Sequence, residues 1–215
     1  MKILITAGPT HEPIDPVRFI GNHSSGKMGI AIAEEFAKEE NEVLLIKGAT
    51  SLSPVNPAIK QVKVQTAAEM FDACTQYFSW ADVIVFAAAV ADYTPRFPSA
   101  TKIKKKEDEF SIELVKTKDI AQELGKEKRD NQVVVGFALE TNDEEQNSRE
   151  KLKKKNFDFI VLNSMRDEGA GFQGDTNKIT IIDREGNVTN FDLKNKTEVA
   201  KDIVDYTNKI LIQKK

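Results

Sequence analysis

The stretch Gly21-Asn22-His23-Ser24-Ser25-Gly26-Lys27-Met28-Gly29 lies between an apolar segment, Ile3-Leu4-Ile5, and a segment with helical periodicity. After the stretch, apolar side chains recur at the spacing of one helix face, at Ile30, Ile32, Ala33, Phe36 and Ala37. A strand, a loop of small residues and a helix in this order expose backbone N–H groups at a helix N-terminus, where a bound anion is stabilised. The stretch therefore predicts a phosphate site in an α/β fold. Its glycine spacing matches neither common nucleotide-binding pattern, so a capping loop without a ligand is the alternative.

The composition is typical of a globular protein. The chain has 215 residues, 40% of them hydrophobic, which suits a single α/β domain spanning residues 1–215. Its longest apolar run, residues 83–91, is about half as long as a bilayer-spanning helix, and no secretion signal is evident, so a cytoplasmic protein is expected. With 31 basic and 34 acidic residues, the chain gives no overall electrostatic reason to expect nucleic acid as a partner. Cys74 is the only cysteine, which excludes an intrachain disulfide.

Strand-like and helix-like segments alternate from the N-terminus to residue 162. Strands are predicted at residues 42–46, 62–64, 82–89, 110–115, 133–137 and 158–162, and helices at about 67–79, from about 119, and at 143–155. Such alternation requires right-handed crossovers and gives a Rossmann-like, mostly parallel sheet with helices on both faces. Ligands bind at the carboxyl ends of such strands, where this sequence has Gly8, residues 87–92 and residues 137–141.

The C-terminal region departs from this alternation. Residues 178–183 and 188–191 resemble two strands joined by a turn at residues 184–187, which predicts a β-hairpin. Apolar side chains from about residue 196 to 213 fall on one stripe and predict a final helix. We therefore expect the hairpin and helix, about residues 176–213, to be appended to the α/β domain.

Residues 93–109 combine prolines with a run of cations. Tyr93-Thr94-Pro95-Arg96-Phe97-Pro98 is expected to be irregular, because proline lacks a hydrogen-bond donor and restricts its neighbours. The run Lys102-Ile103-Lys104-Lys105-Lys106 follows. Because this segment comes directly after Asp92 at a predicted strand end, it is expected to form a mobile flap carrying a phosphate-binding lysine. A solvated charge run is the alternative.

A second lysine cluster lies on the predicted helix at residues 143–155. Lys151 and Lys155 are four residues apart and share one helix face. Both could bind one polyphosphate, or both could belong to an ordinary solvated face.

Six motifs together resemble the bacterial phosphopantothenoylcysteine synthetase family. In chain order they are Ile5–Thr10, Glu12–Arg18, Asn22–Gly29, Ala87–Tyr93, Lys102–Lys105 and Gly136–Thr141. The resemblance spans nearly the whole chain. Many bacterial members carry a flavin-dependent phosphopantothenoylcysteine decarboxylase domain before the synthetase, whereas this chain begins at the synthetase strand. The free-standing form is therefore expected, with the decarboxylase as a separate partner protein.

The resemblance implies a ligase of coenzyme A biosynthesis. CTP, acting with Mg²⁺, would activate the carboxylate of 4′-phosphopantothenate as an acyl-cytidylate and release pyrophosphate. The amine of cysteine would then attack to give 4′-phosphopantothenoylcysteine. Cations and oriented N–H donors would stabilise the charge that develops, and Mg²⁺ can be held largely by phosphate oxygens. The resemblance assigns no protein ligands to the metal, and it implies a homodimer in which the hairpin and neighbouring elements help to pair the subunits.

The resemblance also implies roles for single residues. Asn22 would contact the acyl group, and Lys102 on the flap would neutralise charge during activation. The acyl substrate would be surrounded by Ser24, Ser25, Gly26, Gly29 and Ala88. The nucleotide would be bound by Gly8, Phe86, Ala87, Ala88, Asp92, Lys102, Lys118, Asp119, Ile120, Ala121, Phe137, Lys151 and Lys155.

The sequence departs from the family at Thr117-Lys118-Asp119, where Asn-Pro-Asp is expected.

Two other functions are compatible with the same fold class. A nicotinamide-dependent oxidoreductase would use a similar sheet, but Phe97 rather than lysine stands four residues after Tyr93, and the second strand ends in Lys47-Gly48 without an acidic ribose acceptor. A non-catalytic nucleotide-binding module is the other alternative, because a fold does not establish chemistry.

Overall fold

An eight-stranded sheet with the order β13-β12-β10-β9-β6-β1-β4-β5 organises the protein. The computed structural model describes residues 1–104, 109–140, 142–164 and 174–214. The strands from β10 to β5 are mutually parallel, while β12 and β13 extend one edge in antiparallel pairing. The strands of this sheet are β1 (Lys2–Ala7), β4 (Glu42–Lys47), β5 (Lys60–Lys63), β6 (Val83–Phe86), β9 (Val133–Glu140), β10 (Phe159–Ser164), β12 (Ile179–Asp183) and β13 (Val188–Asn190).

Helices cover both faces of the sheet, as the alternation of segments predicts. The helices are α1 (Lys27–Lys38), α2 (Ala67–Phe78), α3 (Ile120–Gly125), α4 (Glu144–Lys154) and α5 (Lys196–Gln213). Alternate residues of β1 enter different cores: Ile3 and Ile5 pack with α1 and α5, whereas Leu4 packs with α2, α3 and α4. Because each face is buried, the strand is apolar at successive positions and not only at every second one.

The helix boundaries follow local capping chemistry. At the start of α2, the Thr66 hydroxyl accepts a hydrogen bond from the Glu69 N–H at 3.2 Å, and the Glu69 carboxylate accepts from the Thr66 N–H at 3.3 Å. The buried Glu12 carboxylate accepts from the Ala67 N–H at 2.8 Å and fixes the same helix end. Within the described ranges, no helix is long and apolar enough to cross a membrane.

The C-terminal hairpin and helix are present, and they are integrated into the fold. β12 pairs with β10, so the hairpin forms the edge of the main sheet. A two-stranded ribbon of β11 (Thr176–Asn177) and β14 (Lys194–Asn195) leads into α5, which packs against α1. The backbone of β10 would otherwise present an unpaired edge, and pairing with β12 satisfies it.

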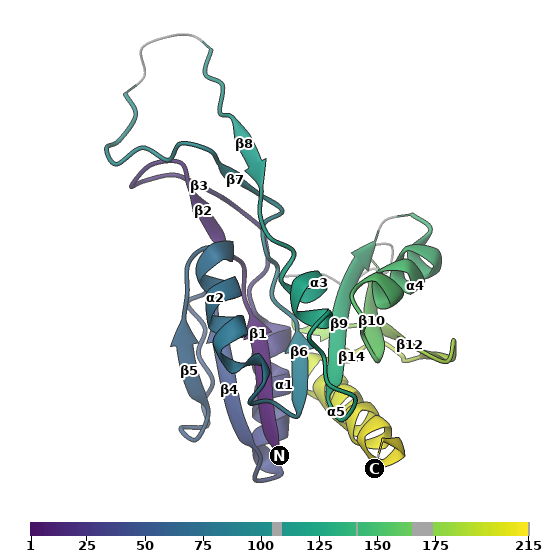
Figure 1. The fold of residues 1–215 in the computed structure, drawn as a ribbon. Coiled ribbons are helices and arrows are strands. Elements are labelled where there is room, and N and C mark those ends of the chain that lie inside the picture. The colour runs from purple at the N-terminus through teal and green to yellow at the C-terminus, as the bar shows by residue number, and fades with distance from the viewer. Residues whose placement is uncertain (105–108, 141, 165–173, 215) are drawn as a thin grey trace.

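Two short ribbons form an arm that rises from the carboxyl end of the sheet (Figure 1). One pairs β2 (His11–Pro13) with β3 (Phe19–Gly21), and the other pairs β7 (Tyr93–Pro95) with β8 (Leu114–Lys116). We use "arm" for these ribbons and the described residues that connect their strands, 11–21, 93–104 and 109–116.

The arm corrects two expectations. The interpretation of residues 93–98 as irregular is wrong for Tyr93–Pro95, because a strand of an isolated ribbon can include a residue without an N–H donor. The strand expected at residues 110–115 begins at Leu114 and pairs with β7, not with the main sheet. Residues 105–108 of the expected flap, and Thr141 of the last motif, lie outside the described residues.

A buried ion cluster joins Lys214, which follows α5, to the amino ends of β9 and β10. The Asp158 carboxylate lies 2.6 Å from the Lys128 Nζ and 2.8 Å from the Lys214 Nζ, and it accepts a hydrogen bond from the Val134 N–H at 2.7 Å. The side chains of Lys128 and Asp158 are each 4% exposed. Burial lowers the pKa of Lys128 to about 8, although Asp158 opposes the shift.

We expect Asp158→Asn to destabilise the protein strongly. Removing one partner of a buried pair leaves an uncompensated charge, here on Lys128, so the free energy of unfolding should fall by about 3–5 kcal/mol. Urea unfolding followed by circular dichroism measures this. Glu123→Gln is the matched control, because it breaks an exposed Lys126–Glu123 pair and should change stability by less than about 1 kcal/mol. Equal effects of the two substitutions would contradict the prediction.

Candidate active site

The carboxyl ends of β1 and β6 lie side by side. The chain adds β4 and β5 on one side of β1 and then β6, β9 and β10 on the other, so the strand order switches between β1 and β6. The segments that follow these two strands remain paired: the Ala89 N–H donates to the Gly8 carbonyl at 3.0 Å, and the Thr10 N–H donates to the Ala89 carbonyl at 3.2 Å. Crevices at such switch points are the usual ligand sites of open α/β sheets. The loops after β1 and β6 therefore form the floor of the candidate site.

Two buried threonine hydroxyls fix the loop after β6. The Thr6 hydroxyl accepts a hydrogen bond from the Ala88 N–H at 3.1 Å, and the Thr10 hydroxyl accepts from the Ala91 N–H at 2.9 Å. Both threonines are buried. One hydroxyl comes from β1 and the other from the loop after it, and they satisfy backbone N–H groups of residues 87–92. These residues are therefore held without a full strand, and β6 ends at Phe86 rather than at Ala89 as expected.

The loop before α1 presents a helix N-terminus to the same edge. The Thr50 hydroxyl donates to the Ser25 carbonyl at 2.8 Å, and the Ser24 hydroxyl accepts from the Gly26 N–H at 3.3 Å. Gly26 caps the helix with φ of 78°, a left-handed conformation that favours glycine. The predicted phosphate loop thus has a defined structure.

Two cavities adjoin this edge. The smaller has a volume of about 150 Å³ and is lined by Ser24, Ser25, Gly26, Lys27, Met28, Gly29, Ala87, Ala88, Ala89, Phe137, Ala138, Leu139, Asn163, Asn177 and Lys196. The larger has a volume of about 710 Å³, and the predicted residues on its wall are Asn22, Phe86, Ala88, Asp92, Lys118, Asp119, Ile120, Ala121, Phe137, Lys151 and Lys155. Ala88, Ala89, Phe137 and Leu139 line both cavities, so the two meet at the ends of β6 and β9.

Asn22 lies at this junction. Its side-chain N–H₂ group donates to the carbonyl oxygens of Ala89 at 3.1 Å and Val90 at 3.3 Å. An amide can donate to one oxygen and accept from an amine without adding charge, which suits a site that handles anions.

Three of the lysines that line the larger cavity interact with nearby groups. Lys155 Nζ lies 3.0 Å from the Asp119 carboxylate, and Lys151 pairs with Glu140. Lys118 Nζ lies 4.4 Å from the centre of the Phe71 ring. Asp119 also caps α3 by accepting from the Gln122 N–H at 3.1 Å. These positions give the cavity a cationic wall balanced by carboxylates.

Two predicted residues line neither cavity. Gly8 lies beneath the loop before α1, where a Cβ on Gly26 would come within 3.0 Å of the Gly8 Cα. Lys102 lies exposed on the arm. The neighbouring Ile103 N–H donates to the Asp15 carboxylate at 3.1 Å, and Arg18, whose hydrogen bond holds the Asp15 pKa well below its usual range, also donates to the Ile103 carbonyl at 3.1 Å.

Sequence reasoning missed the part of the smaller cavity that comes from the C-terminal region. Asn163 is the penultimate residue of β10, Asn177 belongs to β11 and Lys196 begins α5. These residues are far from the glycine-rich loop in sequence, and only the pairing of β12 with β10 brings them near it. The only sequence signal for these three residues was that each is polar and lies at or near the end of a strand or the start of a helix.

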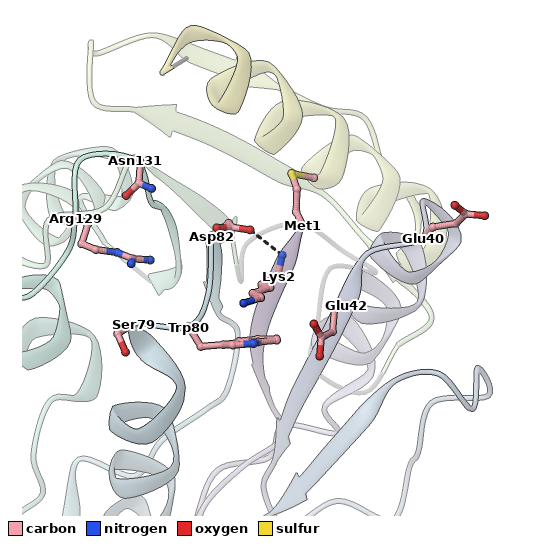
Figure 2. Close-up of a pocket in the computed structure, with 9 residues that line it drawn as sticks. All are labelled: Met1, Lys2, Glu40, Glu42, Ser79, Trp80, Asp82, Arg129 and Asn131. Carbon is pink, nitrogen blue, oxygen red and sulfur yellow. Dashed lines mark hydrogen bonds between the residues drawn. The ribbon is translucent and has the colours of Figure 1, made fainter.

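A separate open hollow of about 570 Å³ lies at the other end of the strands, their amino ends (Figure 2). Its polar groups engage one another: the Lys2 N–H donates to the Asp82 carboxylate at 2.9 Å, and Lys2 Nζ lies 5.8 Å from the centre of the Trp80 ring. It lies at the amino ends of the parallel strands, where ligands seldom bind in such sheets. The candidate site therefore lies at the carboxyl ends of the parallel strands.

The chain is similar to proteins of one described family. A family model described as the DNA/pantothenate metabolism flavoprotein C-terminal domain matches residues 1–211. The coenzyme A biosynthesis bifunctional protein CoaBC of Bacillus subtilis is 43% identical over 202 residues, which are 94% of this chain and 50% of that relative. A crystal structure of the C-terminal domain of a CoaBC protein superposes with a TM-score of 0.83 at 39% identity, covering 99% of this chain and 96% of that one.

A further relative bears a different name. A protein of an unknown prokaryotic organism, called cysteine/cysteine sulfinic acid decarboxylase, is 53% identical over 203 residues, covering 94% of this chain and 56% of the relative. The chain thus spans about half the length of the curated relatives it matches.

Proposed function

Because the chain belongs to the family of the DNA/pantothenate metabolism flavoprotein C-terminal domain, we propose that it joins 4′-phosphopantothenate to cysteine in coenzyme A biosynthesis. The observation that carries the proposal is the shared wall of the two cavities at Ala88 and Ala89. A nucleotide in the larger cavity and a carboxylic acid in the smaller one would meet there, beside Asn22. Transfer of a nucleotidyl group requires this proximity.

The proposed reaction has two steps. A carboxylate oxygen of 4′-phosphopantothenate attacks the α-phosphorus of CTP, and the bond to pyrophosphate breaks. The cysteine amine then attacks the acyl carbon, and CMP leaves as the amide forms. Asn22 would hold the acyl oxygen at the junction, while the lysines of the larger cavity would stabilise the departing pyrophosphate.

We propose Mg²⁺ as a partner of the nucleotide. Asp92 and Asp119 line the larger cavity, and carboxylate oxygens of this kind suit Mg²⁺. Within the described residues, no group of three or more histidine, cysteine or acidic side chains is arranged to hold a metal. The donors present fit a metal ion held partly by phosphate oxygens, whose charge would favour the leaving pyrophosphate.

The name of the decarboxylase relative supports a second candidate activity. That name describes a protein of which this chain covers 56%, so a decarboxylase activity of this chain is a separate proposal. The two candidates differ in product, because decarboxylation of cysteine releases carbon dioxide and needs no nucleotide.

We expect the purified protein to release pyrophosphate continuously only when CTP, Mg²⁺, 4′-phosphopantothenate and cysteine are all present, because without cysteine the first step stops after one turnover. Hydrogen bonds to a base edge can discriminate strongly, so kcat/KM for CTP should exceed that for ATP by about 100-fold or more. Coupled pyrophosphate detection and mass spectrometry of the amide measure both. Carbon dioxide from cysteine alone would favour the decarboxylase, and equal rates with CTP and ATP would reject the nucleotide preference.

Two substitutions should separate the half-reactions. Lys102→Gln removes the proposed flap cation, so pyrophosphate release should fall by about 100-fold or more if one charge contact contributes roughly 3 kcal/mol at the transition state. Asn22→Asp adds a negative charge beside the acyl group and should slow attack by the amine, so acyl-cytidylate should accumulate. Rapid-quench analysis follows that intermediate in both variants. The assignment fails if Lys102→Gln accumulates the intermediate and Asn22→Asp cannot form it.

We also propose a homodimer that associates through the arm. Large apolar side chains are exposed there, including Phe97 at 79%, Val17 at 62% and Phe110 at 59%. Several large apolar side chains exposed on one projecting part of a protein indicate an association surface more strongly than a single one does. The arm is therefore favoured over the hairpin expected from the sequence as the element that pairs the subunits. A cytoplasmic location and a separate decarboxylase partner remain proposals.

The double variant Phe97→Ser/Phe110→Ser should weaken self-association. Each substitution removes an exposed aromatic group from the arm, so sedimentation velocity should shift from twice the mass of one chain toward a single chain. Ile212→Ser is the control, since Ile212 is 74% exposed on α5, away from the arm. A monomeric wild type, or equal shifts in control and double variant, would count against the dimer.

A further inference from the structure

The smaller cavity contains a buried lysine at the start of α5. Lys196 is only 7% exposed, and its Nζ donates to the Gly174 carbonyl at 2.6 Å. Burial and the neighbouring Lys27 lower the pKa of Lys196, whereas Asp175 opposes the shift. Lys27, in turn, pairs with Asp175 at 2.7 Å. Two ammonium groups in a partly desolvated cavity repel; the Asp175 carboxylate offsets part of this repulsion, and a bound anion would offset more of it.

Neutral donors surround the same cavity. Asn177 is 3% exposed, and its side-chain N–H₂ group donates to the Asn163 side-chain oxygen at 3.0 Å. The first turn of α1, beginning at Gly26, forms another part of the wall. Three separate parts of the chain therefore contribute donors or positive charge to one small space.

The chemistry of the substrate fixes which end would enter this space. In the proposed reaction, the acyl substrate is anionic at both ends, with a carboxylate at one and a phosphate monoester at the other. Its carboxylate must lie at the junction beside Ala88 and Ala89, where the nucleotide cavity opens. The opposite end must then point away from the nucleotide, toward Lys27 and Lys196.

We propose that Lys196, together with Lys27, binds the phosphate monoester of the acyl substrate and selects the phosphorylated acid over its unphosphorylated form. This inference rests on the proposed function and deepens it. Lys196 is buried and supplied by the C-terminal helix, so it would be a fixed element of the site, whereas the more exposed Lys27 would add a second contact.

Direct binding without nucleotide tests the assignment. By calorimetry, the wild type should bind 4′-phosphopantothenate more tightly than pantothenate. Lys196→Met should weaken binding of 4′-phosphopantothenate by about 10- to 100-fold, the range for a lost charge-assisted hydrogen bond, and leave pantothenate binding unchanged. In the ligation assay, the same variant should raise KM for 4′-phosphopantothenate more than it lowers kcat. Lys201→Met is the matched control, because Lys201 is exposed on the same helix.

A second variant keeps the test valid if Lys196→Met does not fold. Lys27→Gln changes a side chain that is 35% exposed and should reduce the preference for the phosphorylated ligand in the same direction. Unchanged preference in the folded variants, or equal loss of both ligands, would overturn the inference. Absence of pyrophosphate release by the wild type with every nucleotide would instead overturn the proposed function, and phosphate-selective binding would still be measurable.

Discussion

The close approach of α1 to β1 is the constraint on which the site depends. A Cβ added to Gly29 would lie 2.6 Å from the Ala7 Cβ and 3.0 Å from the Thr6 carbonyl oxygen. In the loop after β4, a Cβ on Gly48 would lie 2.3 Å from the carbonyl oxygen of Pro9, which lies in the loop after β1. Glycine at these positions allows the first turn of α1 and the loops after β1 and β4 to pack directly together. The helix N-terminus is thereby brought level with residues 87–92, and a larger side chain would separate the two walls of the smaller cavity.

The larger cavity resolves a conflict between stability and anion binding. Lysines that face a polyphosphate would repel one another if nothing balanced them, and Asp119 and Glu140 supply that balance for Lys155 and Lys151. The same carboxylates compete with any phosphate that enters. In each pair one partner is about 40% exposed and is screened by water, so the competition is weaker than the attraction of several cations for a polyanion. The cationic wall can therefore be kept ready without abolishing affinity.

Local chemistry made much of the fold predictable. The final helix was expected at about residues 196–213, where α5 lies, because its apolar stripe is regular. The helix from residue 67 was equally clear from its periodicity. Long-range pairing was not predictable: nothing local in residues 178–191 indicates that β12 joins β10. For the same reason the glycine-rich loop and the end of β6 were found as site elements, whereas Lys196 and Asn177 were missed.

Contacts in the turn of the β2–β3 ribbon and at the base of the β7–β8 ribbon limit how Lys102 could reach the site. Asp15 has a fully buried carboxylate that accepts hydrogen bonds from the Val17 and Ile103 N–H groups and from Arg18, which fixes Ile103 to the β2–β3 ribbon. Detaching Ile103 alone would leave part of a buried charge unsatisfied, which is costly. The β7–β8 ribbon is tied at its base by the Thr117 hydroxyl, which donates to the Ala91 carbonyl at 2.7 Å. Lys102 is therefore not free to move as part of a simple lysine-rich loop. For Lys102 to reach the site within one chain, the two ribbons must move together. The part that moves would therefore be the whole arm and not the lysine run alone.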